Sequence, residues 1–434
     1  MPARTPSSSA PTPPPVPAVA PAARGLWRNH DFLTLWAGET VSQIGSQVTL
    51  LALPLTAVLT LRATPFQMGV LRALQYSPAL LIGLFAGVYI DRRRRRPLLI
   101  GADIGRALLL GSIPIVALLG WLGMSYLYGV SFLVGALTVL FEVAYLAFLP
   151  SLVGREQLVD ANGKFEASSA AARIAGPGLG GLLVQLLTAP LAIAADAASF
   201  VVSVVCLALV RTPEPPLPPA AKRAMRREIG EGLRVVARHP ILRASIMTSG
   251  TVNFFSAILN SLFVLYLSRS LGVSPGGIGL LFLVAAVGGL LGAIVAGRVS
   301  QRVGLGRTIL LGMLFLAGGW LFVPLLPAGM PLLLPVLMAS GAVGAAGDSF
   351  YNINVVSLRQ GLIPDRLLGR VSASSRFIIW GAQPFGALLG GVLGERFGLR
   401  PALLLVVVGF FLGLARLIFS PIPAIRTQPE PFDM

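Results

Sequence analysis

Charged side chains inside long apolar runs are the first candidates for chemistry in this sequence, because a charge in that setting is costly and usually functional. Glu142 and Arg173 fall in adjacent runs of the first half, and Asp348 and Arg376 fall in adjacent runs of the second. Each lies roughly 10–15 Å from the same end of its run, at about 1.5 Å of rise per helical residue. We expect two acid–base pairs beside a buried ligand path, or pairs that only hold helices together.

Glu39 is a different kind of candidate, because no arginine is evident at its depth in the adjacent run. It lies about 13 Å into the first apolar run, and Gln43 follows one helical turn later on the same face. An unpaired carboxylate in a water-poor cavity can exchange protons and attract cations. We therefore expect Glu39 to be the main proton-coupling residue, assisted by Glu142 or Asp348.

No set of residues has the pattern of an enzyme or a metal site. Cys206 is the single cysteine, which excludes an internal disulfide, and His30 and His239 stand far apart. The sequence has no G-x-x-x-x-G-K-[ST] loop for nucleotide phosphates, and no serine or cysteine nucleophile with a histidine partner. The sequence predicts a protein that is not an enzyme and holds no metal and no cofactor.

The composition predicts that membrane helices position these side chains. Of 434 residues, 55% are hydrophobic and 12% are charged, and the mean hydropathy is +0.80. A soluble protein carries about twice that charged fraction. The formal net charge of +17 sits in short loops between apolar runs rather than on a soluble domain, so we expect no nucleic-acid partner.

Twelve apolar runs have close to the ~20 residues that a helix needs to cross a bilayer. The sequence therefore predicts an all-α membrane protein with twelve transmembrane helices, at residues 30–57, 67–90, 97–119, 125–149, 164–187, 190–210, 241–268, 276–298, 307–326, 331–356, 369–393 and 400–420. Five consecutive arginines, Arg92–Arg96, must lie in a hydrated loop, and cytoplasmic loops carry the excess of Lys and Arg. We expect both termini to be cytoplasmic.

The two halves of the chain repeat. A shift of about 210 residues places Gly69 on Gly279, Gly87 on Gly297 and Arg92 on Arg302. Two six-helix bundles joined by a long linker are typical of secondary transporters whose halves rock about a central site. The expected parts are a disordered proline-rich tail at 1–25, bundles at 26–210 and 241–420, a linker at 211–240 with an amphipathic basic helix on the membrane surface, and a tail at 421–434.

The loop after the second run resembles the signature of the major facilitator superfamily, and the resemblance covers essentially the whole chain after the tail. Gly87, Asp91, Arg92, Arg95 and Arg96 match that signature, although an arginine replaces its second glycine. The resemblance implies a gate in which Asp91 pairs with Arg106 on the next helix and latches the halves in one state. Asp103, three residues before Arg106, belongs to the same expected gate.

The fifth run looks like the antiporter signature of that superfamily, which implies export. The matching residues are Gly163, Gly176, Pro177, Gly180 and Gly181, while Ala172 stands where the signature has another glycine. Small residues allow helices to approach closely, and a proline bends its helix. The first apolar run, from residue 31 to 54, and the Asp103-x-x-Arg106 spacing are most similar to the branch that holds macrolide and multidrug exporters and the enterobactin exporter.

The resemblance also implies that the first, fourth, seventh and tenth helices line the cavity. This adds Gln43, Asn253, Asn260 and Asn352 as polar contacts and Phe254 with Phe255 as an apolar wall. We expect a monomeric exporter of the bacterial inner membrane that moves amphipathic small molecules, such as drugs, antibiotics or siderophore-like metabolites, against protons. The alternatives are a transporter for one metabolite, in either direction, and a membrane sensor or scaffold without transport.

Overall fold

The computed structural model describes residues 26–83, 90, 93–212, 214 and 225–432. Within these ranges the chain forms thirteen α-helices and no β-strand. The first half holds α1 His30–Leu55, α2 Pro65–Leu81, α4 Arg95–Leu118, α5 Met124–Val153, α6 Leu158–Leu186 and α7 Ala189–Leu209. A linker helix, α8 Met225–Arg238, leads to α9 Pro240–Leu265, α10 Pro275–Val303, α11 Leu305–Leu321, α12 Leu333–Leu362, α13 Asp365–Phe397 and α14 Leu399–Ile418.

Each of the twelve predicted apolar runs coincides with one of these helices, and α8 is the amphipathic linker helix. Ten of the described helical segments are long and apolar enough to cross a membrane. The other two are α2, which is described over only 17 residues, and α6, which carries several charged residues in its first half. The prediction of an all-α membrane protein is confirmed.

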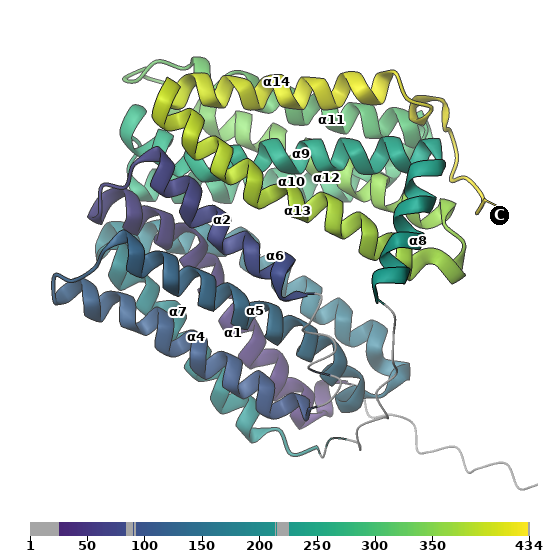
Figure 1. Ribbon diagram of the computed structural model, residues 1–434. Helices are drawn as coiled ribbons and strands as arrows, with labels where there is room; N and C mark the ends of the chain where they lie inside the picture. Colours follow the sequence, from purple (N-terminus) through teal and green to yellow (C-terminus); the bar gives the residue numbers. More distant parts are fainter. Residues whose placement is uncertain (1–25, 84–89, 91–92, 213, 215–224, 433–434) are drawn as a thin grey trace, which may run out of the picture.

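The two halves have matching elements in matching order (Figure 1). The helices α1 and α9 start 210 residues apart, and each runs into a π-helical turn, Thr56–Thr60 or Tyr266–Ser270. Helices α2, α4 and α7 begin at the same offset from α10, α11 and α14. In the first half α1 packs on α6 and α7, and in the second half α9 packs on α13 and α14. The predicted pseudo-symmetric bundles are therefore confirmed.

The halves touch mainly through two helix pairs, α2 with α13 and α6 with α10. In both pairs two glycines face each other close to the loops 61–64 and 271–274. An added Cβ on Gly69 would lie 2.7 Å from the Gly391 Cα, and one on Gly181 would lie 2.7 Å from the Gly279 Cα. A side chain does not fit at that distance, so the bundles are sealed at this end, which we call the closed end.

The linker helix α8 packs on the second bundle at the opposite end, beside the C-terminal segment (Figure 1). A Glu231 carboxylate oxygen lies 2.5 Å from a guanidinium nitrogen of Arg370 on α13. Val235 and Val236 are buried in the core of the fold. The sequence predicts an amphipathic helix on the membrane surface, and the structure shows that the helix packs on α13. The face of α8 that carries Val235 and Val236 packs against α13 and buries both side chains in the apolar core of the fold.

The C-terminal segment is tied to the same region. The ring of Phe432 lies 4.8 Å from the ring of His239, which precedes α9, and the Phe432 amide donates to the Leu362 carbonyl at 3.1 Å. The expected tail 1–25 and the gate residues Gly87, Asp91 and Arg92 lie outside the described residues.

Candidate functional site

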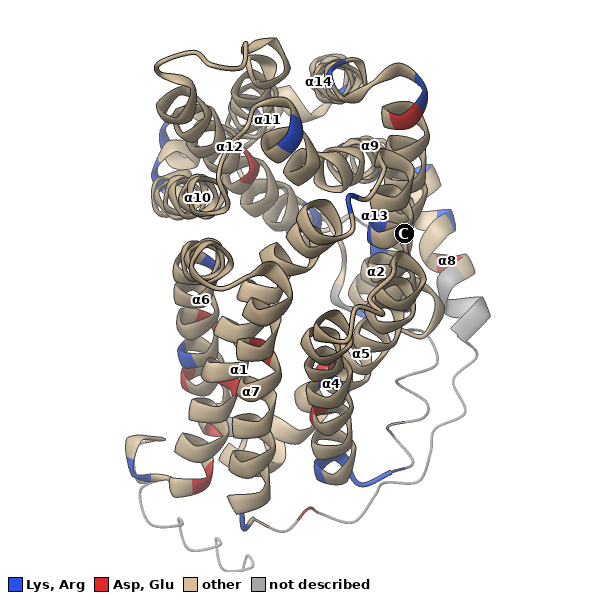
Figure 2. Cartoon of the chain, turned by 90° about the vertical axis from the view of Figure 1, so that its left-hand side faces the viewer, with Lys and Arg blue, Asp and Glu red and all other residues tan. Residues whose placement is uncertain are grey.

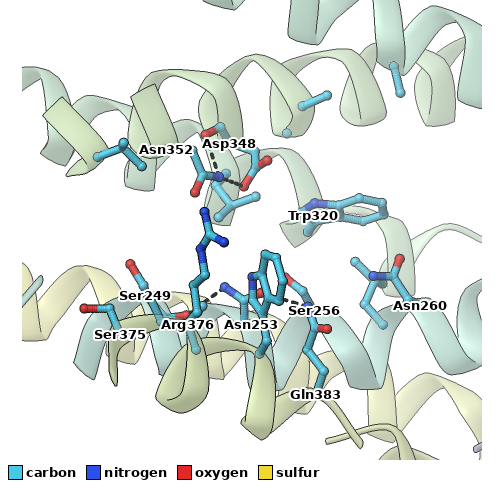
Figure 3. Close-up of a pocket in the computed structure, with 18 of the residues that line it drawn as sticks. Ser249, Asn253, Ser256, Asn260, Trp320, Asp348, Asn352, Ser375, Arg376 and Gln383 are labelled. Atoms are coloured by element: carbon cyan, nitrogen blue, oxygen red, sulfur yellow. Dashed lines mark hydrogen bonds between the residues drawn. The ribbon is translucent and has the colours of Figure 1, made fainter. Parts of the chain in front are cut away.

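The described chain has a polar chamber in each half, and the larger of these two lies in the second half. It has a volume of about 580 Å³ and is bounded by α9, α10, α11, α12 and α13 (Figure 3). Its polar and charged lining residues are Ser249, Asn253, Ser256, Asn260, Asp348, Asn352, Arg359, Gln360, Ser372, Ser375, Arg376 and Gln383. We call it the C-chamber.

Asp348 and Arg376 face each other across the C-chamber from α12 and α13 (Figure 3). Asp348 accepts a hydrogen bond from the Asn352 side chain at 2.8 Å, one turn further along α12. The Arg376 guanidinium lies 5.7 Å from the ring centre of Trp380. Both side chains are exposed to the chamber, and no ion pair within 4.0 Å joins them in the described chain. The expectation that they form a pair is wrong for this conformation.

The face of α9 that lines the C-chamber carries amides and a hydroxyl. Asn253, Ser256 and Asn260 follow one another at intervals of three and four residues, and Gln383 of α13 donates to the Asn253 oxygen at 2.9 Å. Phe254, expected as an apolar wall, is absent from this lining because it is one residue out of phase. It packs against Phe255, and its carbonyl approaches Gly386 of α13.

Arg359, Trp320 and Trp380 are among the members of the C-chamber wall that sequence reasoning missed. Arg359 donates to the Ser245 carbonyl at 3.0 Å and also to the Ser249 hydroxyl, although its position suggested a loop. Trp320 and Trp380 supply aromatic surface, and a lone tryptophan in an apolar run has no sequence signal that separates wall from core. The chamber is therefore polar with aromatic patches, and these patches do not include Phe254.

The smaller chamber lies in the first half, between α1, α4, α5, α6 and α7, and has a volume of about 420 Å³. We call it the N-chamber. Gln43 donates to one oxygen of Glu39 at 3.0 Å, as their spacing predicts. The other Glu39 oxygen, the Gln43 oxygen and the Tyr145 hydroxyl are buried and have no hydrogen-bond partner in the described chain. Buried polar groups are normally bonded, so these three atoms form a site for water or a ligand.

Arg106 also lines the N-chamber, so an arginine does lie near Glu39. It forms a buried ion pair with Asp103 one turn away on α4, and the Ser203 hydroxyl donates to the second Asp103 oxygen at 2.6 Å. The guanidinium carbon of Arg106 lies 4.3 Å from the ring centre of Phe141 and 4.2 Å from the ring centre of Phe200. Arg106 is therefore held inside the first bundle, and its expected latch partner Asp91 lies outside the described residues.

Glu142 lines the N-chamber without meeting Arg173, so the second expected pair is also wrong. Arg173 donates to Glu166 at 2.6 Å and to Ser169 at 2.7 Å on its own helix. Side chains on a helix lean toward its N-terminus, which favours such partners. In addition, α6 packs on α1 and hardly touches α5, so adjacency in sequence did not bring the two helices together.

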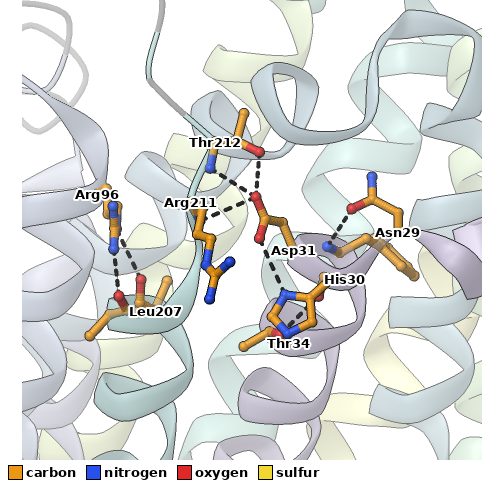
Figure 4. Close-up of polar contacts among 10 residues, drawn as sticks. Asn29, His30, Asp31, Thr34, Arg96, Leu207, Arg211 and Thr212 are labelled. Atoms are coloured by element: carbon orange, nitrogen blue, oxygen red, sulfur yellow. Dashed lines mark hydrogen bonds and ion pairs between the residues drawn. The ribbon is translucent and has the colours of Figure 1, made fainter.

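Two of the arginines that follow the second apolar run, Arg95 and Arg96, bond to the end of α7 and to the start of the linker. The Arg96 guanidinium donates to the carbonyls of Leu207 at 2.9 Å and Ala208 at 2.7 Å, where α7 ends (Figure 4). The amides of Arg95 and Arg96 donate to the Glu214 carboxylate at 2.8 and 2.6 Å. Lys and Arg occur at such helix ends, and both basic and acidic residues also occur within the helices (Figure 2). Arg95 and Arg96 thus hold the start of the linker in place.

The antiporter-like residues divide between two contacts. Gly176 and Gly180 face α1, where added Cβ atoms would lie 2.2 Å from the Gln47 Cβ and 3.2 Å from the Val48 Cα. Gly181 faces α10 of the other half, and Pro177 lines a small pocket between the halves. Gly163 has open space around it, so it has no packing role in this structure.

Arg72, which is half-buried, and Asp196, which is buried, are two further polar residues within the helices. The Arg72 side chain of α2 donates to the Asn260 carbonyl of α9 at 3.3 Å and thereby joins the halves. Asp196 is buried on α7 and accepts from the Ser199 hydroxyl at 3.1 Å. A lone arginine in the second apolar run was the available signal for Arg72.

Comparisons with known proteins agree with this architecture. The family model described as "Transmembrane secretion effector" (MFS_3) matches residues 21–433. The chain is 27% identical to the multidrug efflux pump Tap of Mycolicibacterium fortuitum, over 88% of this chain and 95% of Tap. It is 26% identical to macrolide efflux protein A of Streptococcus pyogenes, over 85% of this chain and 90% of that protein.

Among solved structures, a bacterial homologue of the iron transporter ferroportin in its inward-facing state superposes with a TM-score of 0.72. That comparison covers 91% of this chain and 99% of the homologue at 18% identity, and it therefore concerns the fold alone.

Proposed function

Because the chain belongs to the MFS_3 family of transmembrane secretion effectors, within the major facilitator superfamily, we propose that it exports amphipathic small molecules by proton antiport. Its relatives include multidrug and macrolide efflux pumps, so a membrane transporter of the efflux type is the coarse function. Proton coupling and the kind of substrate are the steps beyond it.

The N-chamber carries the proposal of proton coupling. Glu39 has one buried oxygen without a partner, and Glu142 and Arg106 line the same chamber. A carboxylate that can be neutral or charged changes the field of this chamber by one full charge. Protonation of Glu39, assisted by Glu142 or Asp348, would weaken substrate binding in the state open to the outside. Release of the proton to the cytoplasm would then restore high affinity.

The proposed orientation in the membrane rests on the charge of the loops. Cytoplasmic loops carry the excess of Lys and Arg, which puts both termini in the cytoplasm of a bacterial cell and the closed end toward the outside. The conformation described above would then be the one that collects substrate from the cytoplasm. Each half contains its own chamber, so a monomer holds all the parts that this cycle needs.

Proton movement in inside-out membrane vesicles tests the proposal. The vesicle lumen is acidified by respiration, a quenched pH dye reports the gradient, and antibiotics, cationic dyes and metabolites are added one at a time. We expect alkalinisation of the lumen with some of these compounds and no such response in Glu39→Gln. The matched control is Glu166→Gln, because Glu166 pairs with Arg173 on α6 outside both chambers.

Each outcome has a distinct meaning. Alkalinisation that persists in Glu39→Gln moves the coupling site to Glu142 or Asp348. A wild-type protein that moves a labelled compound without protons is a uniporter or a transporter for one metabolite. No response of any kind from folded protein in these vesicles contradicts multidrug export and favours a transporter for one untested metabolite, a uniporter, or the sensor or scaffold.

A further inference from the structure

The wall of the C-chamber carries one acid, Asp348, and two arginines, and none of the three has an ion-pair partner in the described chain. Arg359 is bonded to Ser245 and Ser249, which leaves Asp348 and Arg376 as the charges that a ligand can reach. Asp348 accepts hydrogen bonds from Asn352, and the Arg376 guanidinium lies over the ring of Trp380. They lie on opposite walls, point toward one another and are exposed to the chamber (Figure 3). Two opposite charges that face each other without pairing leave a space in which a ligand can interact with both.

The rest of the wall suits a ligand with several polar groups. Asn253 and Gln383 form a bonded amide pair, and Asn260 and Ser256 continue that row along α9. The chamber volume of about 580 Å³ lies in the range of pockets that hold drug-sized molecules. Trp320 and Trp380 offer flat apolar surface for a ring system.

A purely cationic ligand fits this chamber poorly, because Arg376 would repel it wherever Asp348 attracts it. A purely anionic ligand meets the reverse problem. Charge-assisted hydrogen bonds are roughly twice as strong as neutral ones, and arginine binds carboxylates through two parallel bonds. The pattern of charges therefore selects a ligand that carries both signs.

We propose that the C-chamber binds zwitterionic amphiphiles, with the anionic group at Arg376, the ammonium group at Asp348 and an aromatic body against the tryptophans. This inference rests on the proposed function, since it names the substrate class of the exporter. It goes beyond the attraction of cations that the sequence predicts for Glu39.

Norfloxacin and two of its derivatives provide a matched test. Norfloxacin is fluorescent and zwitterionic, its ethyl ester keeps only the ammonium group, and its N-acetyl derivative keeps only the carboxylate. Binding to the full-length protein in lipid nanodiscs is measured by equilibrium dialysis, with empty nanodiscs subtracted. We expect the ester and the N-acetyl derivative to bind about tenfold or more weakly than norfloxacin, as the loss of one charge-assisted contact predicts.

Two variants separate the ends of the ligand. Arg376→Gln should weaken norfloxacin about tenfold and leave the ester unchanged, while Asp348→Asn should weaken norfloxacin and leave the N-acetyl derivative unchanged. Arg376→Lys keeps the charge and should keep the order of the three probes. Arg173→Gln and Asp160→Asn, whose partners lie on the same helix outside the C-chamber, are the controls.

Three results would overturn the assignment. The first is an ester that binds as tightly as norfloxacin, and the second is no binding of norfloxacin by folded wild-type protein. The third is an equal loss for all three probes in both variants, which would mean that Arg376 and Asp348 serve only each other. The vesicle assay with cationic dyes is independent, so proton-coupled export that survives there leaves the proposed function standing while this inference fails.

Discussion

Replacing Gly181 with valine should shift the protein away from the conformation with the sealed closed end. The Cβ of that valine would lie 2.6 Å from the Pro275 carbonyl oxygen and 2.7 Å from the Gly279 Cα. Since neither neighbour is a flexible side chain, α6 and α10 must separate by roughly 1 Å to reach ordinary contact distance. Overpacking of this kind costs about 1–3 kcal/mol, which changes the ratio of two conformations by about 5–150-fold.

Thiol labelling measures that shift. Asn260 lines both the C-chamber and the small pocket between the halves, so Asn260→Cys in a Cys206→Ser background reports access from either side. A membrane-impermeant maleimide is applied to intact cells and to inside-out vesicles. In Gly181→Val the rate from the side of the closed end should rise about tenfold, and the rate from the other side should fall.

Gly163→Val is the matched control, because an added Cβ there meets nothing within 4 Å. It lies on the same helix and should leave both labelling rates unchanged. Equal rates in Gly181→Val and the wild type, with both proteins folded, would refute the reasoning. The contact between α6 and α10 would then play no part in sealing the closed end.

Two further predictions concern stability in detergent. Arg106→Leu leaves Asp103 buried without its cation and should lower the free energy of unfolding by about 3–5 kcal/mol. Adding Asp103→Asn removes the unpaired charge and should restore most of that free energy. A double variant that is as unstable as Arg106→Leu would contradict this prediction. Burial lowers the pKa of His239, and its neutral ring accepts the Leu242 amide where α9 begins. Stability from this ring is therefore present above the unfolded pKa of about 6.5 and lost as the pH falls below it. Thermal unfolding between pH 7.5 and 5 should be less pH-dependent in His239→Asn, which keeps a capping oxygen, and an identical slope would exclude His239 as the cause.

The sequence by itself determined the helices and their repetition. A run of about 20 apolar residues has no stable alternative to a helix in a bilayer, because every backbone group must be bonded within the segment. The repeat was visible in the sequence because both halves place small residues at equivalent positions, where their helices pack closely. The helical period also placed Glu39 and Gln43 together correctly, because residues four apart share a face.

Only the tertiary structure decided which helices are neighbours. The sequence placed Glu142 and Arg173 on consecutive helices, but α6 packs on α1, and Arg173 turns back to partners on its own helix. Asn253 and Phe254 differ by one position, about 100° around a helix, and that phase separates chamber wall from packed core. Packing between helices that are distant in sequence decides which helices are neighbours and which face of a helix lines a chamber. The hydropathy of the sequence does not predict that packing.

The sequence likewise could not predict which charged side chains form ion pairs. Depth along each helix could suggest that Asp348 and Arg376 lie at similar levels, and they do face one chamber. Whether they touch depends on how far apart α12 and α13 are held, and α13 is held by its contacts with α9 and α2. The sequence therefore determined that charges lie in the core of this membrane protein, and the tertiary structure decided that two of them remain apart, facing a cavity, because the helices that carry them pack on other partners.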